Sequence, residues 1–384
     1  MTAQTTNARS GKHSPAPFPI SNFGLRGNPV PSSQIKKKVR ILSIDGGGIR
    51  GIIPATIAWF LEQRLQERTG NPDARISDYF DFLAGTSTGG ILVCTYLMPD
   101  PERPGRPKLN ARESLAMYLE EGGWGIFSRS LYRKLTSMMG LLNEKYCSQA
   151  LEKALKRCFG PTRLQDFLKP CLVTAYNITG RRAFFFTSLD AKKDPNQDFA
   201  AWQAARATAS APAFFSPALL QYGNGNTIPL VDGGVFANNP ALCAFTEAQK
   251  ACFSQLPDSA NKPDHPTASD MVIVSLGTGA NEAGYNYESI KSKGMAGWIK
   301  PIIDILMSAS TDTVDYQLQE LFAHQPRNCD GRYYRINPSP GQAAPAMDEV
   351  SARNRWALHQ AALDYIEANR ELLEEIVDQL IRNQ

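Results

Sequence analysis

The chain has 384 residues, of which 42% are apolar and 20% are charged. This composition indicates a packed globular core and excludes a chain that is disordered throughout. The formal net charge of +4 is too small over this length to indicate a nucleic acid polymer as a partner, although it is compatible with contact with an anionic membrane surface.

Signals for targeting and for metal binding are missing from the sequence. No run reaches the roughly 18 apolar residues that a membrane-spanning helix requires, and Met1–Ser10 lacks the apolar stretch of a secretory signal. The seven cysteines are scattered without a CxxC pair, which predicts reduced thiols in a cytoplasmic protein. Because no Cys/His cluster has metal-ligand spacing, we expect neither a metal nor a cofactor.

The N-terminal part differs in composition from the rest. Residues 1–35 are rich in Ser, Pro, Asn and Gly and lack apolar periodicity, which predicts a flexible tail. We expect 36–384 to form a single domain. Its chemistry-bearing motifs fall within 41–280, and 285–384 is predicted to be a helical C-terminal part.

Short apolar runs alternate with helical patterns along this domain. The predicted strands are Val39–Ile44, Tyr79–Ala84, Cys171–Tyr176, Phe184–Thr187 and Met271–Leu276. Helical spacing follows over 52–65 and 91–97, and 351–382 is predicted as one long helix with an apolar face. Alternation of helices with continuous apolar strands predicts an α/β sheet with helices on both faces.

The segment Gly85–Gly89 matches the pattern G-x-S-x-G. In hydrolases this pattern places a serine on a sharp strand-to-helix turn, with its side chain projecting from the edge of the sheet. An apolar strand precedes the segment and an apolar helix follows it. This context favours a nucleophilic Ser87 over an ordinary glycine-rich turn.

A second glycine cluster, Asp45–Gly51, follows the first predicted strand and contains G-x-G-x-x-G. A dinucleotide-binding loop is the alternative interpretation, but no clear βαβ unit with an acidic residue about 20 positions later completes that motif. Consecutive glycines near a helix N-terminus can instead present backbone N–H groups to an oxyanion that develops beside Ser87.

The general base is either a histidine or a carboxylate. The chain has four histidines, and none of them is next to a glycine turn or a strand end. Asp232 instead ends an apolar stretch and is followed by two glycines. An aspartate has an ordinary pKa near 4, so it serves as a base only in contact with the serine and in a dry site. A turn-forming aspartate is the alternative at this point.

Three motifs in this order, Asp-Gly-Gly-Gly-x-Arg-Gly, Gly-x-Ser-x-Gly and Asp-Gly-Gly, resemble the patatin-like phospholipase family. The resemblance spans about 41–280 and includes Ser210-Ala211-Pro212, the following Phe214-Phe215, and Ser275–Gly279. It implies a three-layer α/β/α patatin-like fold with a mostly parallel central sheet. It also implies a serine hydrolase that acts on lipid acyl esters with a Ser-Asp dyad and no catalytic histidine.

The same resemblance assigns a role to each motif. Ser87 is the implied nucleophile, Asp232 the base, and Arg50 lies near the oxyanion hole. The implied oxyanion-hole residues are Gly46, Gly47 and Gly48. In this scheme Ser87 attacks the ester carbonyl, and a water activated by Asp232 releases the fatty acid from the acyl-enzyme. No metal is required.

The expected partners also follow from the resemblance. They are membrane phospholipids, which a cytoplasmic enzyme would contact peripherally at the inner membrane surface. Some bacterial relatives look like antiviral phospholipases that a cyclic nucleotide switches on, so a cyclic-nucleotide activator and a homo-oligomer are further expectations. Two alternatives stay open: a catalytically silent lipid- or nucleotide-binding protein on the same fold, and a Ser-His-Asp esterase that uses His324 or His359.

Two further segments have an ambiguous pattern. Phe127–Lys134 mixes aromatic and basic residues, and we predict a solvated helix face there rather than a contact with lipid phosphates. Trp298–Met307 is strongly apolar. We predict a buried helix for it, with a lid, a membrane contact or a dimer face as alternatives.

Overall fold

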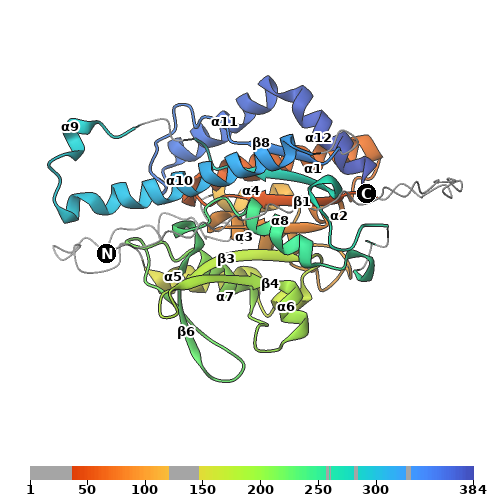
Figure 1. Cartoon of the computed structure of the whole chain (residues 1–384), viewed down its shortest axis with the longest axis horizontal. Helices are drawn as coiled ribbons and strands as arrows, with labels where there is room; N and C mark the ends of the chain where they lie inside the picture. The colour runs from red at the N-terminus through yellow and green to blue at the C-terminus, as the bar shows by residue number, and fades with distance from the viewer. Residues whose placement is uncertain (1–36, 121–146, 257–258, 260, 281–283, 326–329) are drawn as a thin grey trace, which may run out of the picture. The chain divides into compact units, whose positions relative to one another are not determined.

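The computed structural model describes residues 37–120, 147–256, 259, 261–280, 284–325 and 330–384 (Figure 1). The predicted tail over 1–35 and the segment Phe127–Lys134 lie outside the described residues. Lys37–Gln384 forms one compact unit, and the fold described below is that of this unit.

The described residues form an 8-stranded sheet with the order β5-β6-β3-β2-β1-β7-β8, and β4 pairs with β3 outside this path. The central strands β3, β2, β1, β7 and β8 are parallel, whereas β4 and β6 are antiparallel to β3. The strand bounds are β1 Val39–Ile44, β2 Phe82–Gly85, β3 Cys171–Asn177, β4 Arg182–Thr187, β5 Ala218–Gln221, β6 Thr227–Asp232, β7 Met271–Leu276 and β8 Arg332–Ile336.

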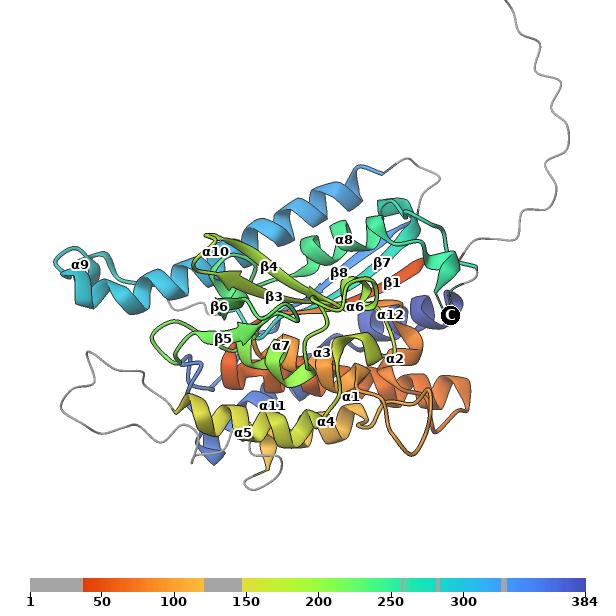
Figure 2. The ribbon, with the colours of Figure 1, turned by 90° about the horizontal axis from the view of Figure 1, so that it is seen from below.

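Helices cover both faces of the sheet. Figure 2 shows α8 and α10 on one face, and α1, α4, α5 and α11 on the other. The helix bounds are α1 Ile52–Thr69, α2 Ile76–Tyr79, α3 Thr88–Leu97, α4 Ala111–Leu119, α5 Ser148–Phe159, α6 Ser188–Lys193, α7 Ala201–Thr208, α8 Ala241–Lys250, α9 Tyr287–Ile290, α10 Met295–Ala323, α11 Ala352–Ala368 and α12 Arg370–Arg382. None of these described helices combines the length and the apolar character that crossing a bilayer requires.

The central strand β1 shows why helices cover both faces of the sheet. Successive side chains of a strand point to opposite faces, so Leu42 and Ile44 enter the apolar cluster under α1 and α3. Val39 and Ile41 enter a second apolar cluster, under α8. All of these side chains are buried. The protein therefore has a three-layer α/β/α fold with a mostly parallel central sheet, as the sequence predicts.

Most of the predicted strands are confirmed, but the second one is shorter than expected. Tyr79 ends helix α2, and strand β2 begins only at Phe82. The reason is Asp81, whose carboxylate forms a buried salt bridge with the guanidinium of Arg40 at 2.8 Å. The same carboxylate accepts the backbone N–H of Arg40 at 2.8 Å, so Asp81 anchors the start of the strand instead of extending it.

The prediction of one long helix over 351–382 is wrong, because two helices occupy this segment. Asn369 separates α11 from α12 with φ −120° and ψ 30°, and its side-chain amide donates to the carbonyl oxygen of Tyr365 at 3.0 Å. Such a local side-chain bond competes with the helical backbone pattern. The predicted apolar face is nevertheless buried in both helices: Leu358, Ala362, Ile366, Leu373, Ile376, Val377 and Leu380.

The prediction of a buried helix for Trp298–Met307 is also wrong. The segment belongs to α10, and four of its apolar side chains are 44–50% exposed: Ile299, Ile302, Ile305 and Leu306. Helix α10 packs on the sheet mainly through a later part, where Leu318 is fully buried and Val314 lies against the cluster under α8. The sequence pattern cannot distinguish an apolar face that is packed from one that is not.

Candidate active site

Ser87 occupies the sharp turn between β2 and α3. Its backbone angles are φ 55° and ψ −121°, a combination that non-glycine residues rarely adopt and that is typical of functional sites. A Cβ on Gly85 would lie 2.3 Å from the carbonyl oxygen of Gly89, and a Cβ on Gly89 would lie 2.2 Å from that of Ile44. Both glycines of the motif are therefore required for the close backbone approach that makes the turn.

The strained turn is held by neighbouring polar groups. The N–H of Ser87 donates to the hydroxyl of Thr208, at the end of α7, at 2.8 Å. The hydroxyls of Thr86 and Thr174 are 2.7 Å apart, and Thr86 also donates to the carbonyl oxygen of Ala237 at 2.6 Å. These groups are buried, so they fix the direction in which Ser87 points.

Strand β3 brings Ser87 and Asp232 together. One edge of β3 is taken by β4 over residues 172–177, so β2 and β6 share the other edge. Strand β2 pairs there up to Gly85, opposite Val173, and β6 ends at Asp232, opposite Ala175. Because β2 and β6 run toward each other along this edge, their carboxyl ends meet, which brings Ser87 and Asp232 together.

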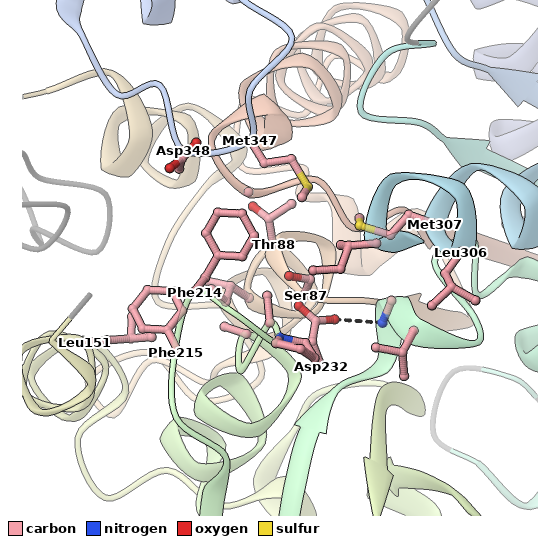
Figure 3. Close-up of a pocket in the computed structure, with 18 residues that line it drawn as sticks. Ser87, Thr88, Leu151, Phe214, Phe215, Asp232, Leu306, Met307, Met347 and Asp348 are labelled. Carbon is pink, nitrogen blue, oxygen red and sulfur yellow. Dashed lines mark hydrogen bonds between the residues drawn. The ribbon is translucent and has the colours of Figure 1, made fainter. Parts of the chain in front are cut away.

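The Asp232 carboxyl group lies in a dry and weakly polar environment. Its Oδ1 accepts the N–H of Gly234 at 2.7 Å, and Figure 3 shows Ser87 directly beside it. Burial raises the pKa of Asp232 from 3.8 to about 7, although hydrogen bonds from Ser87 and Gly234 act in the opposite direction. The group is thus poised to exchange a proton near neutral pH.

The glycine loop after β1 lies directly against the serine. A Cβ on Gly46 would be 3.2 Å from the Cβ of Ser87. The N–H of Gly46 donates to the carbonyl oxygen of Asn238 at 3.0 Å, whereas the N–H groups of Gly47 and Gly48 have no acceptor among the described residues. The structure therefore leaves Gly47 and Gly48 available as oxyanion donors, and Gly46 only if its bond to Asn238 opens.

Two side chains far downstream in the sequence hold the glycine loop in place. Thr278 donates to the carbonyl oxygen of Gly46 at 2.7 Å. The carboxylate of Asp45 receives two bonds from the guanidinium of Arg335, at 2.6 and 3.1 Å. Residues more than 200 positions downstream thus hold the glycine backbone close to Ser87.

Arg50 lies near the loop but makes few contacts there. Its Nε donates to the carbonyl oxygen of Gly47 at 3.5 Å, and burial lowers the pKa of its guanidinium, partly offset by Asp304 and Asp45. Arg50 lines a cavity of about 750 Å³ together with polar groups such as Asn238 and Thr278.

The serine itself opens into a smaller cavity of about 70 Å³. Its walls are mostly apolar, and Figure 3 shows the side chains of Phe214, Phe215 and Met347 pointing into it. The two cavities adjoin, since both are lined by Phe214, Ile303, Met307, Met347 and Asp348. Ser87 and Asp232 thus line the smaller, apolar cavity, which shares one wall with a larger cavity of mixed polarity.

No histidine is among the described residues that line either cavity. His359 instead contacts Thr56 at 2.9 Å, and His324 is exposed at the end of α10. Among the described residues, no group of three His, Cys, Asp or Glu side chains is arranged to hold a metal ion.

Several residues of the site were not singled out from the sequence. Thr208 was missed, although it precedes the Ser210-Ala211-Pro212 motif by two positions. Met347 was missed because it comes from the C-terminal part and carries no motif. Leu306 and Met307 lie in the apolar segment Trp298–Met307, for which a lid or a membrane contact is an alternative to a buried helix, but the sequence does not connect this segment with Ser87.

Comparisons of the sequence with known proteins lead to patatins and patatin-like proteins. The family model described as patatin-like phospholipase matches residues 42–245. "Patatin-like protein 1" of Oryza sativa subsp. indica is 34% identical over 342 residues, which cover 85% of this chain and 81% of the relative. "Patatin-2-Kuras 3" of Solanum tuberosum is 33% identical and covers 90% and 84%. "Probable inactive patatin-3-Kuras 1" of the same species is 32% identical and covers 84% of each.

Proposed function

The chain belongs to the patatin-like phospholipase family, and we propose that it is a serine hydrolase that releases fatty acids from membrane phospholipids through Ser87 and Asp232. Family membership supports lipid acyl hydrolase activity in general. The observation that carries the finer proposal is the contact between the Ser87 hydroxyl and a buried carboxyl group whose pKa is about 7.

The acylation step uses groups that already face one another. The ionised Asp232 accepts the proton of the Ser87 hydroxyl, and the serine oxygen attacks the ester carbonyl carbon. The negative charge that develops on the carbonyl oxygen is stabilised by the N–H groups of Gly47 and Gly48. When the intermediate collapses, Asp232 returns its proton to the leaving alcohol, and the fatty acyl group stays on Ser87.

The deacylation step repeats the same chemistry with water. Asp232, ionised again, takes a proton from a water molecule, which attacks the acyl-enzyme carbonyl. Collapse of the second intermediate gives the free fatty acid, and the proton on Asp232 returns to Ser87. One carboxyl group thus acts as base and as acid in turn, which is most effective when its pKa is close to the working pH.

The two cavities suggest how a phospholipid would lie. The apolar chamber at Ser87 suits an acyl chain, because its walls offer aromatic and aliphatic contacts. The larger cavity, with Arg50 and the polar groups around it, suits the glycerol and head-group part. The scissile ester would then lie between them, next to the glycine loop.

Labelling with a fluorophosphonate probe tests this proposal without any assumption about the lipid. The parent protein should be labelled, and Ser87→Ala should not. Asp232→Asn should lose at least about a hundredfold in labelling rate, since the base is removed. The matched controls His324→Gln and His359→Gln should keep the parental rate. Labelling of Ser87→Ala, or its loss in either histidine variant, would contradict the dyad.

The second candidate is a silent lipid- or nucleotide-binding protein, and one relative is indeed named as probably inactive. Release of fatty acid from membrane extracts, measured by mass spectrometry, separates the two. Activation by a cyclic nucleotide and a role in antiviral defence rest on the sequence resemblance alone, so one arm of the assay contains cyclic nucleotides. We likewise propose that the enzyme is cytoplasmic, that it acts at the inner membrane surface and that it forms a homo-oligomer.

A further inference from the structure

Helix α10 carries large apolar side chains on its solvent-facing side. Met295, Ile299, Ile302, Ile305 and Leu306 are between 44% and 92% exposed. Their spacing of three or four residues places them on one side of the helix. We call these five residues the apolar face of α10. Exposed aliphatic side chains grouped in this way usually mark an interaction site.

The apolar face is not the side by which α10 is attached. Thr311 and Leu318 are buried against the rest of the unit, and they lie on the opposite side of the helix. After Leu306 the exposed positions are mostly polar, for example Ser308 and Asp312. The exposed apolar character is therefore largely confined to the half of the helix that borders the active site.

This surface is continuous with the pocket of Ser87. Leu306 belongs to the apolar face and also lines that pocket, and its helical neighbours Ile303 and Met307 line the pocket from the inside. Figure 3 shows Leu306 and Met307 adjacent on α10, at the edge of the pocket. An acyl chain that moves along α10 would thus pass Leu306, Ile303 and Met307 between solvent and the serine.

The position of α10 and the side chains next to its apolar face also suit contact with a lipid surface. In both Figure 1 and Figure 2, α9 and the start of α10 extend past the end of the sheet. Tyr285 and Tyr287 are exposed there, and the Nζ of Lys291 lies 5.8 Å from the ring centre of Tyr287. Tyrosine and lysine combine an apolar body with a polar tip, so they suit the head-group layer of a membrane.

We propose that the apolar face of α10, with Tyr285 and Tyr287 beside it, is the surface by which the enzyme rests on a lipid bilayer. The proposal deepens the lipid hydrolase function proposed above and rests on it. A bilayer is preferred over a second copy of this chain because the face leads directly into the pocket that receives an acyl chain. Apolar side chains inserted between lipids would let that chain enter without crossing water.

The charge of this region defines the expected lipid dependence. Between Tyr285 and Leu306 the sequence has three lysines and two acidic residues, and Lys291 pairs with Glu288. The net positive charge is small, so burial of apolar area provides most of the binding. We therefore expect binding to phosphatidylcholine vesicles, with a modest increase when phosphatidylglycerol is added.

Vesicle flotation with the Ser87→Ala protein measures binding without lipid turnover. The test variant is Met295→Glu/Ile302→Glu, since neither residue lines a cavity. The control is Tyr316→Glu/Trp356→Glu, which adds the same charge at two exposed sites outside the apolar face. The test variant should bind vesicles about tenfold more weakly, whereas the control should bind as the parent does. Equal binding of the test variant and the parent would overturn the proposal.

Two further measurements separate the possible failures. With Ser87 present, the test variant should hydrolyse a soluble short-chain ester at the parental kcat/KM and lose activity only on vesicles. No ester hydrolysis by the parent would count against the proposed function, while the flotation result would still decide on the membrane surface. If the test substitutions instead convert a dimer into a monomer in sedimentation velocity and leave vesicle binding intact, the face is an interface between two copies and the proposal fails.

Discussion

The pH dependence of acylation offers the most direct test of the role of Asp232. Only the ionised carboxylate accepts the Ser87 proton, and burial raises the pKa of this group from 3.8 to about 7. The rate of acylation should therefore rise with pH and level off above the pKa. At pH 6 about one tenth of the groups are ionised, so kcat/KM should be about tenfold below its plateau.

The raised pKa of Asp232 also makes the free energy of unfolding depend on pH. The difference of about 3 pKa units corresponds to about 4 kcal/mol in favour of the neutral carboxyl group in the folded state. Since the folded protein binds this proton more tightly than the unfolded chain, the contribution is fully present below pH 4 and is lost as the pH rises through 7. Asp232→Asn, which keeps a neutral side chain, should unfold at a higher denaturant concentration than the parent at pH 8.

The pH dependence of acylation is measured as the rate of inactivation by a fluorophosphonate between pH 5 and 9, followed by gel fluorescence. A histidine base could also give a midpoint near 7, so the profile is repeated at two temperatures and in His359→Gln. The pKa of an imidazole falls clearly on warming, whereas that of a carboxyl group hardly moves. A flat profile down to pH 5, a midpoint that moves on warming, or a changed profile in His359→Gln would refute the assignment.

Three further predictions concern the support of the site. Thr208→Val removes the acceptor that holds the strained turn and should lower the acylation rate by about tenfold or more, whereas Thr208→Ser should retain it; equal rates for both would contradict a positioning role. Gly47→Ala places a Cβ 2.2 Å from the Thr278 hydroxyl and should abolish labelling, and a normal rate would exclude this loop from the oxyanion hole. Asp81→Leu leaves the buried Arg40 unpaired and should lower the free energy of unfolding by about 3–5 kcal/mol in urea, and a smaller loss would show that Arg40 finds another partner.

The sequence predicts the fold well because its central strands are short, mostly apolar runs. Val39–Ile44 and Met271–Leu276 are buried along their full length, and strands of this kind require cover on both faces of the sheet. The glycines near Ser87 are equally informative, since the backbone leaves no room for a side chain at Gly85 or Gly89. Local sequence and global fold agree at these positions.

The sequence is less informative where a residue acts through a distant partner. Asn369 looks like an ordinary helix residue, yet it separates two helices. Arg335 has no motif around it, and only the structure places it on Asp45. Trp298–Met307 has the composition of a core helix, but periodicity records only that one side is apolar and not whether anything covers it.

The meeting of Ser87 and Asp232 illustrates the same limit at the centre of the site. A parallel arrangement brings the carboxyl ends of neighbouring strands to one edge of a sheet, and this expectation holds for β1 and β2. Asp232 arrives differently, because β6 is antiparallel to β3 and approaches from the opposite end. No periodicity encodes which edge of β3 this strand joins. That choice, made by β4 taking the other edge, places a carboxyl group against the serine, where burial then raises its pKa to about 7.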